Sequence, residues 1–309
     1  MKIFSEASRT FTQVTVLVGF AIFAATTTSS AQKQTTFASV AEHYDVLPDQ
    51  IYRSVGDWQG KLDLYLPIEG NNHPLVMFIH GGGWTQSSKE TEVLYILPYL
   101  QQGWAVANVE YRLASTAKAP ASVLDCRCAF EWIQENATRL KVDAKRIVVA
   151  GISAGGHLAL SVATVEPIDG KAECYKTSHK PAAIVNLFGP SDINELIAGP
   201  KPFAQAVEWF RGVERPETVA ELISPIKRLS KRTPPVITLH GVDDEIIPYS
   251  QSAELHRQLT KLGVRNRLIS LRSEGHGGFS AAEWNSAYQQ IFAFVRNELR
   301  GREGGTRTR

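Results

Sequence analysis

Ser153 stands in a sequence pattern that is typical of a catalytic nucleophile. It is the centre of Gly151-Ile152-Ser153-Ala154-Gly155, a GxSxG pattern that follows the apolar run RIVVA and precedes the helical pattern GHLALSVATV. A strand, a tight turn and a helix in this order form a nucleophile elbow, in which the serine is held in strained geometry and the glycines avoid backbone clashes. The pattern predicts that Ser153 attacks a carbonyl carbon. A glycine-rich helix cap without chemistry is the alternative.

A serine nucleophile needs a base to accept its proton and a carboxylate to orient that base. His276 is the best candidate for the base, because it follows the apolar run NRLISL in a loop, EGHGGF, whose glycines leave the ring accessible. The apolar run PPVITLH leads into a loop with three adjacent acids, Asp243, Asp244 and Glu245, and chemistry alone does not decide among them. The order serine, acid, histidine differs from that of chymotrypsin and subtilisin. The remaining histidines, His240 among them, are expected to have surface or capping roles.

The string His80-Gly81-Gly82-Gly83-Trp84 follows the apolar run PLVMFI and predicts an oxyanion hole. Glycines let backbone N–H groups approach an oxyanion without obstruction, and we expect Gly82, Gly83 and Ala154 to supply the N–H donors. Trp84 is a candidate substrate-binding residue at the floor of an acyl pocket, with ordinary packing as the alternative. His80 is expected to hold the loop by a hydrogen bond rather than to move protons.

The elements that must position these residues alternate between short apolar runs and amphipathic ones. Strand-like runs occupy residues 62–66, 74–80, 104–111, 146–151, 182–189, 234–240 and 266–271, and helical patterns occupy about 121–140, 154–165, 250–263 and 281–299. Strands and helices that alternate in this way predict an α/β fold with a mostly parallel sheet covered by helices on both faces. Residues 166–181 and 193–230 fit the alternation poorly and are expected to be insertions that form a small cap.

Composition excludes several other classes of protein. The chain of 309 residues is 43% hydrophobic and 21% charged, as in ordinary globular domains, and carries a net charge of +2. Four Arg and one Glu in the last ten residues account for that excess, so the rest of the chain has no basic face for nucleic acid. The predicted acyl transfer needs no metal and no organic cofactor, and the three cysteines have no matching histidine spacing for zinc.

Four motifs together resemble a known family. HGGGW, GISAGGHLAL, HGVDDEIIP and EGHGGF, in this order and spacing, resemble the hormone-sensitive-lipase-like bacterial esterases, and especially the secreted carbohydrate-esterase branch with acetylxylan and feruloyl esterases. The likeness covers about residues 50–298. It implies an α/β-hydrolase domain over residues 32–299 and selects Asp244 as the acid, four residues after His240. The family's VxYRL turn and its helix-leading aspartate are matched by residues 109–113 and by Asp125, which we interpret as scaffold.

The resemblance implies a serine esterase that forms an acyl-enzyme with small-molecule or polysaccharide-linked esters, with a short-chain or carbohydrate-linked acyl group. Two other functions share this scaffold. Serine peptidases of the prolyl-oligopeptidase kind and arylformamidases cleave amide bonds, although the chain has no room for a peptidase propeller. A receptor or adhesion module with a decayed triad would bind without catalysis.

The N-terminus has the pattern of a secretory signal peptide. Lys2 and Arg9 precede an apolar stretch over residues 14–25, and small residues follow it up to Ala31, where we expect cleavage. The apolar stretch is shorter than the roughly 20 residues of a membrane-spanning helix, so we expect a secreted or periplasmic protein with no membrane association after cleavage. Residues 300–309 are expected to be a disordered tail.

An oxidising compartment would permit one disulfide among the three cysteines. Cys126 and Cys128 lie two positions apart on a predicted helix, where side chains point away from each other and cannot readily pair. Either of them could pair with Cys174. Three unpaired thiols, with Cys126 packed in the core, are the alternative.

Overall fold

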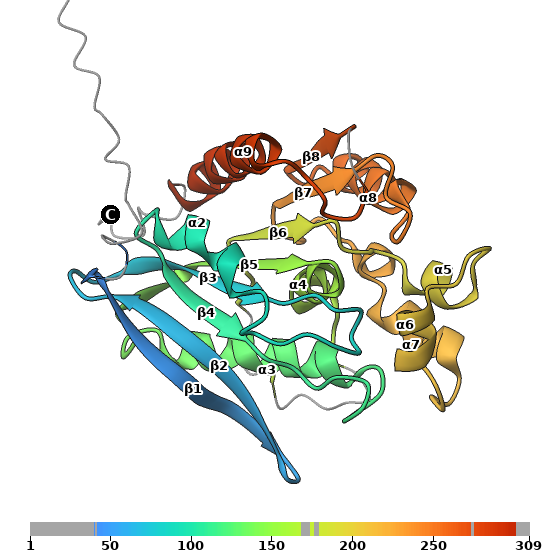
Figure 1. The fold of residues 1–309 in the computed structure, drawn as a ribbon, viewed down its shortest axis with the longest axis horizontal. Coiled ribbons are helices and arrows are strands. Elements are labelled where there is room, and N and C mark those ends of the chain that lie inside the picture. Colours follow the sequence, from blue (N-terminus) through green and yellow to red (C-terminus); the bar gives the residue numbers. More distant parts are fainter. Residues whose placement is uncertain (1–39, 41, 168–173, 176–178, 273–274, 301–309) are drawn as a thin grey trace, which may run out of the picture. The chain divides into compact units, whose positions relative to one another are not determined.

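The computed structural model describes residues 40, 42–167, 174–175, 179–272 and 275–300. The predicted signal peptide and residues 301–309 of the predicted tail lie outside the described residues. Within them the chain forms one sheet with the strand order β1-β2-β4-β3-β5-β6-β7-β8 (Figure 1). The strands are β1 (Tyr44–Val55), β2 (Trp58–Pro67), β3 (His73–Ile79), β4 (Ala105–Val109), β5 (Val142–Ile152), β6 (Ala183–Leu187), β7 (Val236–Gly241) and β8 (Asn266–Leu271).

The sheet is parallel from β4 to β8, while β1 and β2 are antiparallel additions at one edge. Each of the seven strand-like runs found in the sequence corresponds to one of the strands β2 to β8. Strand β1 was not predicted, because most of its side chains are exposed and its sequence contains Pro48. Its pairing with β2 is also irregular, with a register shift between Leu47 and Gln50. An edge strand of this kind lacks the apolar alternation that identifies strands in a sequence.

Helices cover both faces of the central sheet. They are α2 (Leu97–Leu100), α3 (Ala121–Asn136), α4 (Ala154–Thr164), α8 (Tyr249–Lys261) and α9 (Ala281–Arg300), with the 3₁₀ turn η1 (Val93–Ile96) before α2. Side chains of β3 alternate between two hydrophobic clusters. Met77 and its neighbours on one face pack with α3, α4 and α8, and Phe78 and its neighbours on the other face pack with α2 and α9. The predicted α/β architecture is therefore confirmed.

The predicted insertion at residues 193–230 folds as three short helices, α5 (Ile193–Ala198), α6 (Ala204–Trp209) and α7 (Pro216–Ile223), and a 3₁₀ turn, η2 (Pro225–Arg228). They are drawn together to one side of the sheet in Figure 1. The Trp209 ring stacks on the Trp84 ring with centroids 4.5 Å apart, which joins this region to the glycine loop after β3. The Trp209 ring is fully buried in this contact. The other predicted insertion, residues 166–181, lies largely outside the described residues.

One disulfide joins Cys128 on α3 to Cys174, with the two Cα atoms 4.7 Å apart. Cys126 is buried and has a free thiol. The structure therefore selects Cys128 from the two partners that the sequence left open for Cys174. It also places the sulfur atoms of Cys126 and Cys128 in different surroundings, as expected for positions two apart on a helix.

Candidate active site

Ser153 occupies the turn between β5 and α4 and has a backbone φ of +53°, which is strained for a residue with a side chain. The turn is possible because its neighbours are glycines. A Cβ on Gly151 would lie 2.1 Å from the carbonyl oxygen of Gly155, and a Cβ on Gly155 would lie 2.1 Å from the carbonyl oxygen of Ile79. The nucleophile elbow predicted from the sequence is therefore present.

Three side chains that are remote in the sequence meet at the carboxyl ends of the strands. The Ser153 hydroxyl lies 2.8 Å from Nε2 of His276, to which it can donate its proton. Nδ1 of the same ring lies 2.7 Å from Oδ2 of Asp244 and donates to it. Both distances are within hydrogen-bonding range, and the histidine lies between hydroxyl and carboxylate as a general base requires. The structure thus brings the three predicted residues together.

Asp244 is the acid that the fold selects from the three adjacent candidates. Its carboxylate is buried, whereas Asp243 and Glu245 are exposed and point their charges to solvent. Burial by itself would raise the pKa of Asp244, but hydrogen bonds from His240, from His276 and from the Ile247 N–H outweigh it and hold the pKa below its usual range. Asp244 is therefore ionised beside the imidazole.

The two oxygens of Asp244 have separate partners. Oδ1 accepts hydrogen bonds from the backbone N–H groups of Ile246 and Ile247, both at 2.9 Å. Oδ2 accepts from His276 and, at 3.1 Å, from Nε2 of His240, whose ring is fully buried and whose Nδ1 lies 2.7 Å from the Ser252 hydroxyl. The expected surface or capping role for His240 is wrong, because this ring fixes the carboxylate that orients His276.

The glycine loop after β3 lines the same cleft as Ser153. Gly82 and Gly83 have positive φ values of 90° and 59°, and a Cβ on Gly82 would lie only 2.1 Å from the carbonyl oxygen of Gln86. In the described part of the chain their N–H groups donate to no acceptor. The third predicted donor, Ala154, is the first residue of α4, where backbone N–H groups lack partners within the helix.

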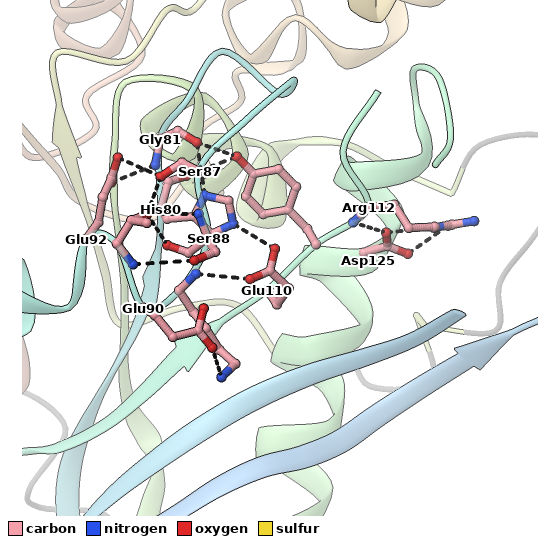
Figure 2. A network of polar contacts seen from close by, with 12 residues as sticks. His80, Gly81, Ser87, Ser88, Glu90, Glu92, Glu110, Arg112 and Asp125 are labelled. Atoms are coloured by element: carbon pink, nitrogen blue, oxygen red, sulfur yellow. Dashed lines mark hydrogen bonds and ion pairs between the residues drawn. The ribbon is translucent and has the colours of Figure 1, made fainter. Parts of the chain in front are cut away.

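A polar network holds this loop from behind (Figure 2). The Gly81 N–H donates to Oε2 of Glu92 at 2.8 Å, and its carbonyl oxygen accepts from the Tyr111 hydroxyl at 2.8 Å. The His80 ring lies between the Gly81 carbonyl oxygen and the Glu110 carboxylate, at 3.0 and 3.2 Å, and stacks on Tyr111. The structural role predicted for His80 is consistent with these contacts.

A second part of the network supports the prediction that residues 109–113 and Asp125 are scaffold. The carboxylate of Asp125 is buried and accepts hydrogen bonds from Nε and Nη2 of Arg112 at 2.8 and 2.7 Å (Figure 2). It also accepts one from Nη1 of Arg53 at 2.9 Å. These contacts tie α3 to the chain after β4 and to β1. Two arginines around one buried carboxylate satisfy its charge.

The cleft in front of Ser153 has a volume of about 290 Å³. Its lining combines polar and aromatic side chains, namely Gln86, Glu92, Tyr95, Phe188, Phe203 and Gln205, with Ile152, Ile246 and residues of the glycine and histidine loops. Phe188 also packs edge-on against the His276 ring, with centroids 4.7 Å apart. The prediction that Trp84 floors this cleft is wrong for this structure, because Trp84 is fully buried against Trp209 and His157.

Sequence reasoning missed Glu92 and Phe188 as well as the role of His240. Glu92 lies in a turn just before η1, and Phe188 follows β6, so neither stands in a recognisable motif. For Phe188 a signal was present in the sequence, because it follows the end of a parallel strand, where functional groups collect. His240 stands four residues before Asp244, a spacing that also was visible.

The strand order, the serine in the turn after β5 and the histidine after β8 define an α/β-hydrolase. More specifically, the chain belongs to the BD-FAE family, whose model matches residues 62–259. A solved structure described as a truncated form of a carbohydrate esterase from gut microbiota is similar over 83% of this chain and 96% of that one, with a TM-score of 0.71 and 25% identity. The native form of a thermophilic esterase from Thermogutta terrifontis is similar over 86% and 95%, with a TM-score of 0.69 and 25% identity.

Among curated proteins, esterase LipC of Mycobacterium tuberculosis is 30% identical over 213 residues, which are 66% of this chain and 53% of that protein. The chain therefore spans about half the length of this relative. None of the helices in the described part of the chain has the length and apolar character needed to cross a bilayer.

Proposed function

We propose that this protein is a serine esterase that hydrolyses carboxylic esters through an acyl-enzyme. The observation that carries the proposal is the pair of contacts on His276, 2.8 Å to the Ser153 hydroxyl and 2.7 Å to the Asp244 carboxylate, beside a loop with free N–H groups. Membership of the BD-FAE family and likeness to proteins named as esterases support ester rather than amide chemistry.

Acylation begins when Nε2 of His276 takes the proton of Ser153 and Oγ attacks the ester carbonyl carbon. The carbonyl oxygen becomes an oxyanion and accepts hydrogen bonds from the N–H groups of Gly82, Gly83 and Ala154. Asp244 keeps the imidazole proton on Nδ1 and stabilises the imidazolium. Nε2–H then protonates the leaving alcohol as the C–O bond breaks, and the acyl group remains on Ser153.

Deacylation repeats these steps with water. His276 removes a proton from the water, whose oxygen attacks the acyl carbon, and the oxyanion again lies in the glycine loop. Collapse of the intermediate breaks the bond to Oγ, which recovers its proton from Nε2–H. The products are the free acid and the regenerated enzyme.

The substrate class that we propose is an ester with a small acyl group on a carbohydrate. The polar residues Gln86 and Gln205 line the cleft together with Tyr95, Phe188 and Phe203. Hydrogen-bonding groups among aromatic rings suit a polar alcohol with an apolar acyl group. The similar solved structure described as a carbohydrate esterase supports the same class.

The first test replaces the nucleophile. Ser153→Ala should lower kcat/KM for p-nitrophenyl acetate at least about 10⁴-fold while leaving the thermal unfolding temperature near that of the wild type. A fluorophosphonate probe should label the wild type and not the variant. Turnover that survives the substitution would refute the proposal. Assays on acetylated xylan and feruloylated arabinose test the substrate class separately.

The two competing functions have their own readouts. An amide hydrolase would cleave a p-nitroanilide at least as well as the matched p-nitrophenyl ester. A binding module with an inactive site would not react with the fluorophosphonate at all.

We further propose that residues 1–31 are a signal peptide and that the mature protein is secreted or periplasmic. The proposal rests on the charged, apolar and small-residue segments of the N-terminus. N-terminal sequencing of the exported protein should find Gln32 as the first residue, and an uncleaved N-terminus in the exported fraction would refute it.

A further inference from the structure

Glu92 places a carboxylate next to the nucleophile. A Cβ built on Gly81 would lie 3.2 Å from Oε1 of Glu92 and 3.3 Å from the Cβ of Ser153, so these two atoms are at most about 6.5 Å apart. Glu92 lines the same cleft as Ser153 and His276. An acyl group bound for attack by Ser153 therefore lies close to this negative charge.

The position of the Glu92 side chain is well defined by two donors. The Gly81 N–H donates to Oε2 at 2.8 Å, and the Ser87 hydroxyl donates to Oε1 at 3.3 Å (Figure 2). Glu92 is the N-cap residue of η1 but its side chain makes no capping hydrogen bond. The carboxylate instead reaches back to the glycine loop, and both of its contacts could be made by a neutral amide.

No cation neutralises this carboxylate within the described part of the chain. The nearest lysine in the sequence, Lys89, pairs with Asp49, Asp63 and Glu90 instead. No Lys or Arg of the described residues lines the cleft. Burial raises the pKa of the cleft residue Tyr95, and the charge of Glu92 raises it further, as expected if the field of this carboxylate extends into the cleft.

We propose that Glu92 determines the charge preference of the site: it favours uncharged acyl groups and discriminates against acyl groups that carry a carboxylate. The proposal rests on the proposed esterase function and names the class of acyl group that this site accepts. For an acyl carboxylate that lies about 6 Å from the Glu92 carboxylate, Coulomb repulsion at an effective dielectric constant near 40 weakens binding about tenfold.

The experiment compares two esters of equal acyl chain length, p-nitrophenyl pentanoate and mono-p-nitrophenyl glutarate, which differ by a terminal carboxylate. The preference is the ratio of their kcat/KM values after subtraction of buffer hydrolysis. Glu92→Gln keeps an acceptor for the Gly81 N–H and a side-chain group for Ser87 while removing the charge. The matched control is Glu90→Gln, which removes a charge two residues away on a side chain that is exposed and does not line the cleft.

We expect E92Q to lower the preference for pentanoate about tenfold, mainly through a lower KM for the glutarate ester, and E90Q to leave it unchanged. A wild-type preference that E92Q does not alter, or that E90Q alters equally, would overturn the proposal. So would a loss of activity on both esters in equal proportion, because it would assign Glu92 to holding the loop alone.

Ionic strength provides a measurement that does not depend on the variant folding. Raising NaCl to 0.5 M should reduce the wild-type preference by screening, and a preference that is independent of salt would overturn the proposal. Failure of the proposed function has a different signature, because neither ester would then be hydrolysed in a manner that depends on Ser153.

Discussion

The substitution Asp244→Asn tests the orienting carboxylate with almost no change in shape. In the wild type Oδ1 accepts two backbone N–H groups, while Oδ2 accepts from both His276 and His240. An asparagine has one oxygen, and the two fixed backbone donors at 2.9 Å select it for the Oδ1 position. The NH₂ group then faces the two imidazoles.

That arrangement reverses the tautomer of the base. A donor facing Nδ1 of His276 forces the ring proton onto Nε2, where it points to the Ser153 hydroxyl. The ring can then no longer accept the serine proton. In serine proteases the equivalent change lowers kcat about 10⁴-fold, which corresponds to about 5.5 kcal/mol in the activation barrier. We expect a loss of that size here.

The assay is steady-state hydrolysis of p-nitrophenyl acetate at neutral pH, with circular dichroism as the check on folding. Two neighbours serve as matched controls, because Asp243 and Glu245 are exposed acids in the same loop. Asp243→Asn and Glu245→Gln should retain kcat within about threefold. If D244N kept more than a tenth of wild-type kcat, or if either control lost as much activity, the assignment of the acid would be refuted.

Three further predictions concern the glycine loop, a buried histidine and the disulfide. Gly82→Ala should lower kcat/KM at least about 10²-fold, because its Cβ would lie 2.1 Å from the carbonyl oxygen of Gln86 and would displace the N–H donors of the loop. The control is Gly103→Ala, at a similar φ of +75° but with open space around it. This variant should lose about 1 kcal/mol of stability and no activity. Burial lowers the pKa of His157 to about 4 from the usual 6.5 of histidine, so between these pH values the unfolded chain binds a proton at this residue and the native state does not. The free energy of unfolding should therefore fall by up to about 3 kcal/mol as the pH drops from 6.5 to 4, and urea titrations should show this slope reduced in His157→Gln; an unchanged slope would contradict the assignment. Cys174→Ser opens a loop of 46 residues and should cost about 4 kcal/mol in the chain-entropy treatment, with the melting temperature then insensitive to dithiothreitol; a variant as stable as the oxidised wild type would show that the bond contributes nothing.

Much of the fold could be predicted because the buried elements carry strong periodicity. Strands β4, β6 and β7 are wholly buried, and β3 and β5 are buried over their second halves, so these segments are continuous apolar runs. Strand β1 and the helices of the cap were not predicted. The first is largely exposed, and two of the three cap helices have only six residues, too few for a helical period to be recognised.

Side-chain contacts between remote elements were the part of the site that the sequence could not indicate. Phe188 is an example, because its ring follows β6 and packs against the ring of His276, which follows β8. Trp84 shows the same limit in the opposite direction. Its place beside the glycines suggested the cleft, but the ring turns away and stacks on Trp209, which comes from the cap. The residue type alone does not indicate on which side of the loop such a ring packs.

Close contacts between backbone segments can be inferred from the sequence, because they require glycine. A Cβ on Gly155 would meet the carbonyl oxygens of Ile79 and His80 at 2.1 and 2.4 Å, so the nucleophile turn packs directly on the end of β3. The glycine loop with Gly82 and Gly83 starts at that same end of β3. The separation of the Ser153 turn from the Gly82 and Gly83 N–H groups is therefore set by main chain against main chain, with no side chain between. Such a contact requires glycine on one side, and this is why two glycine-rich strings, far apart in the chain, were enough to predict that they meet.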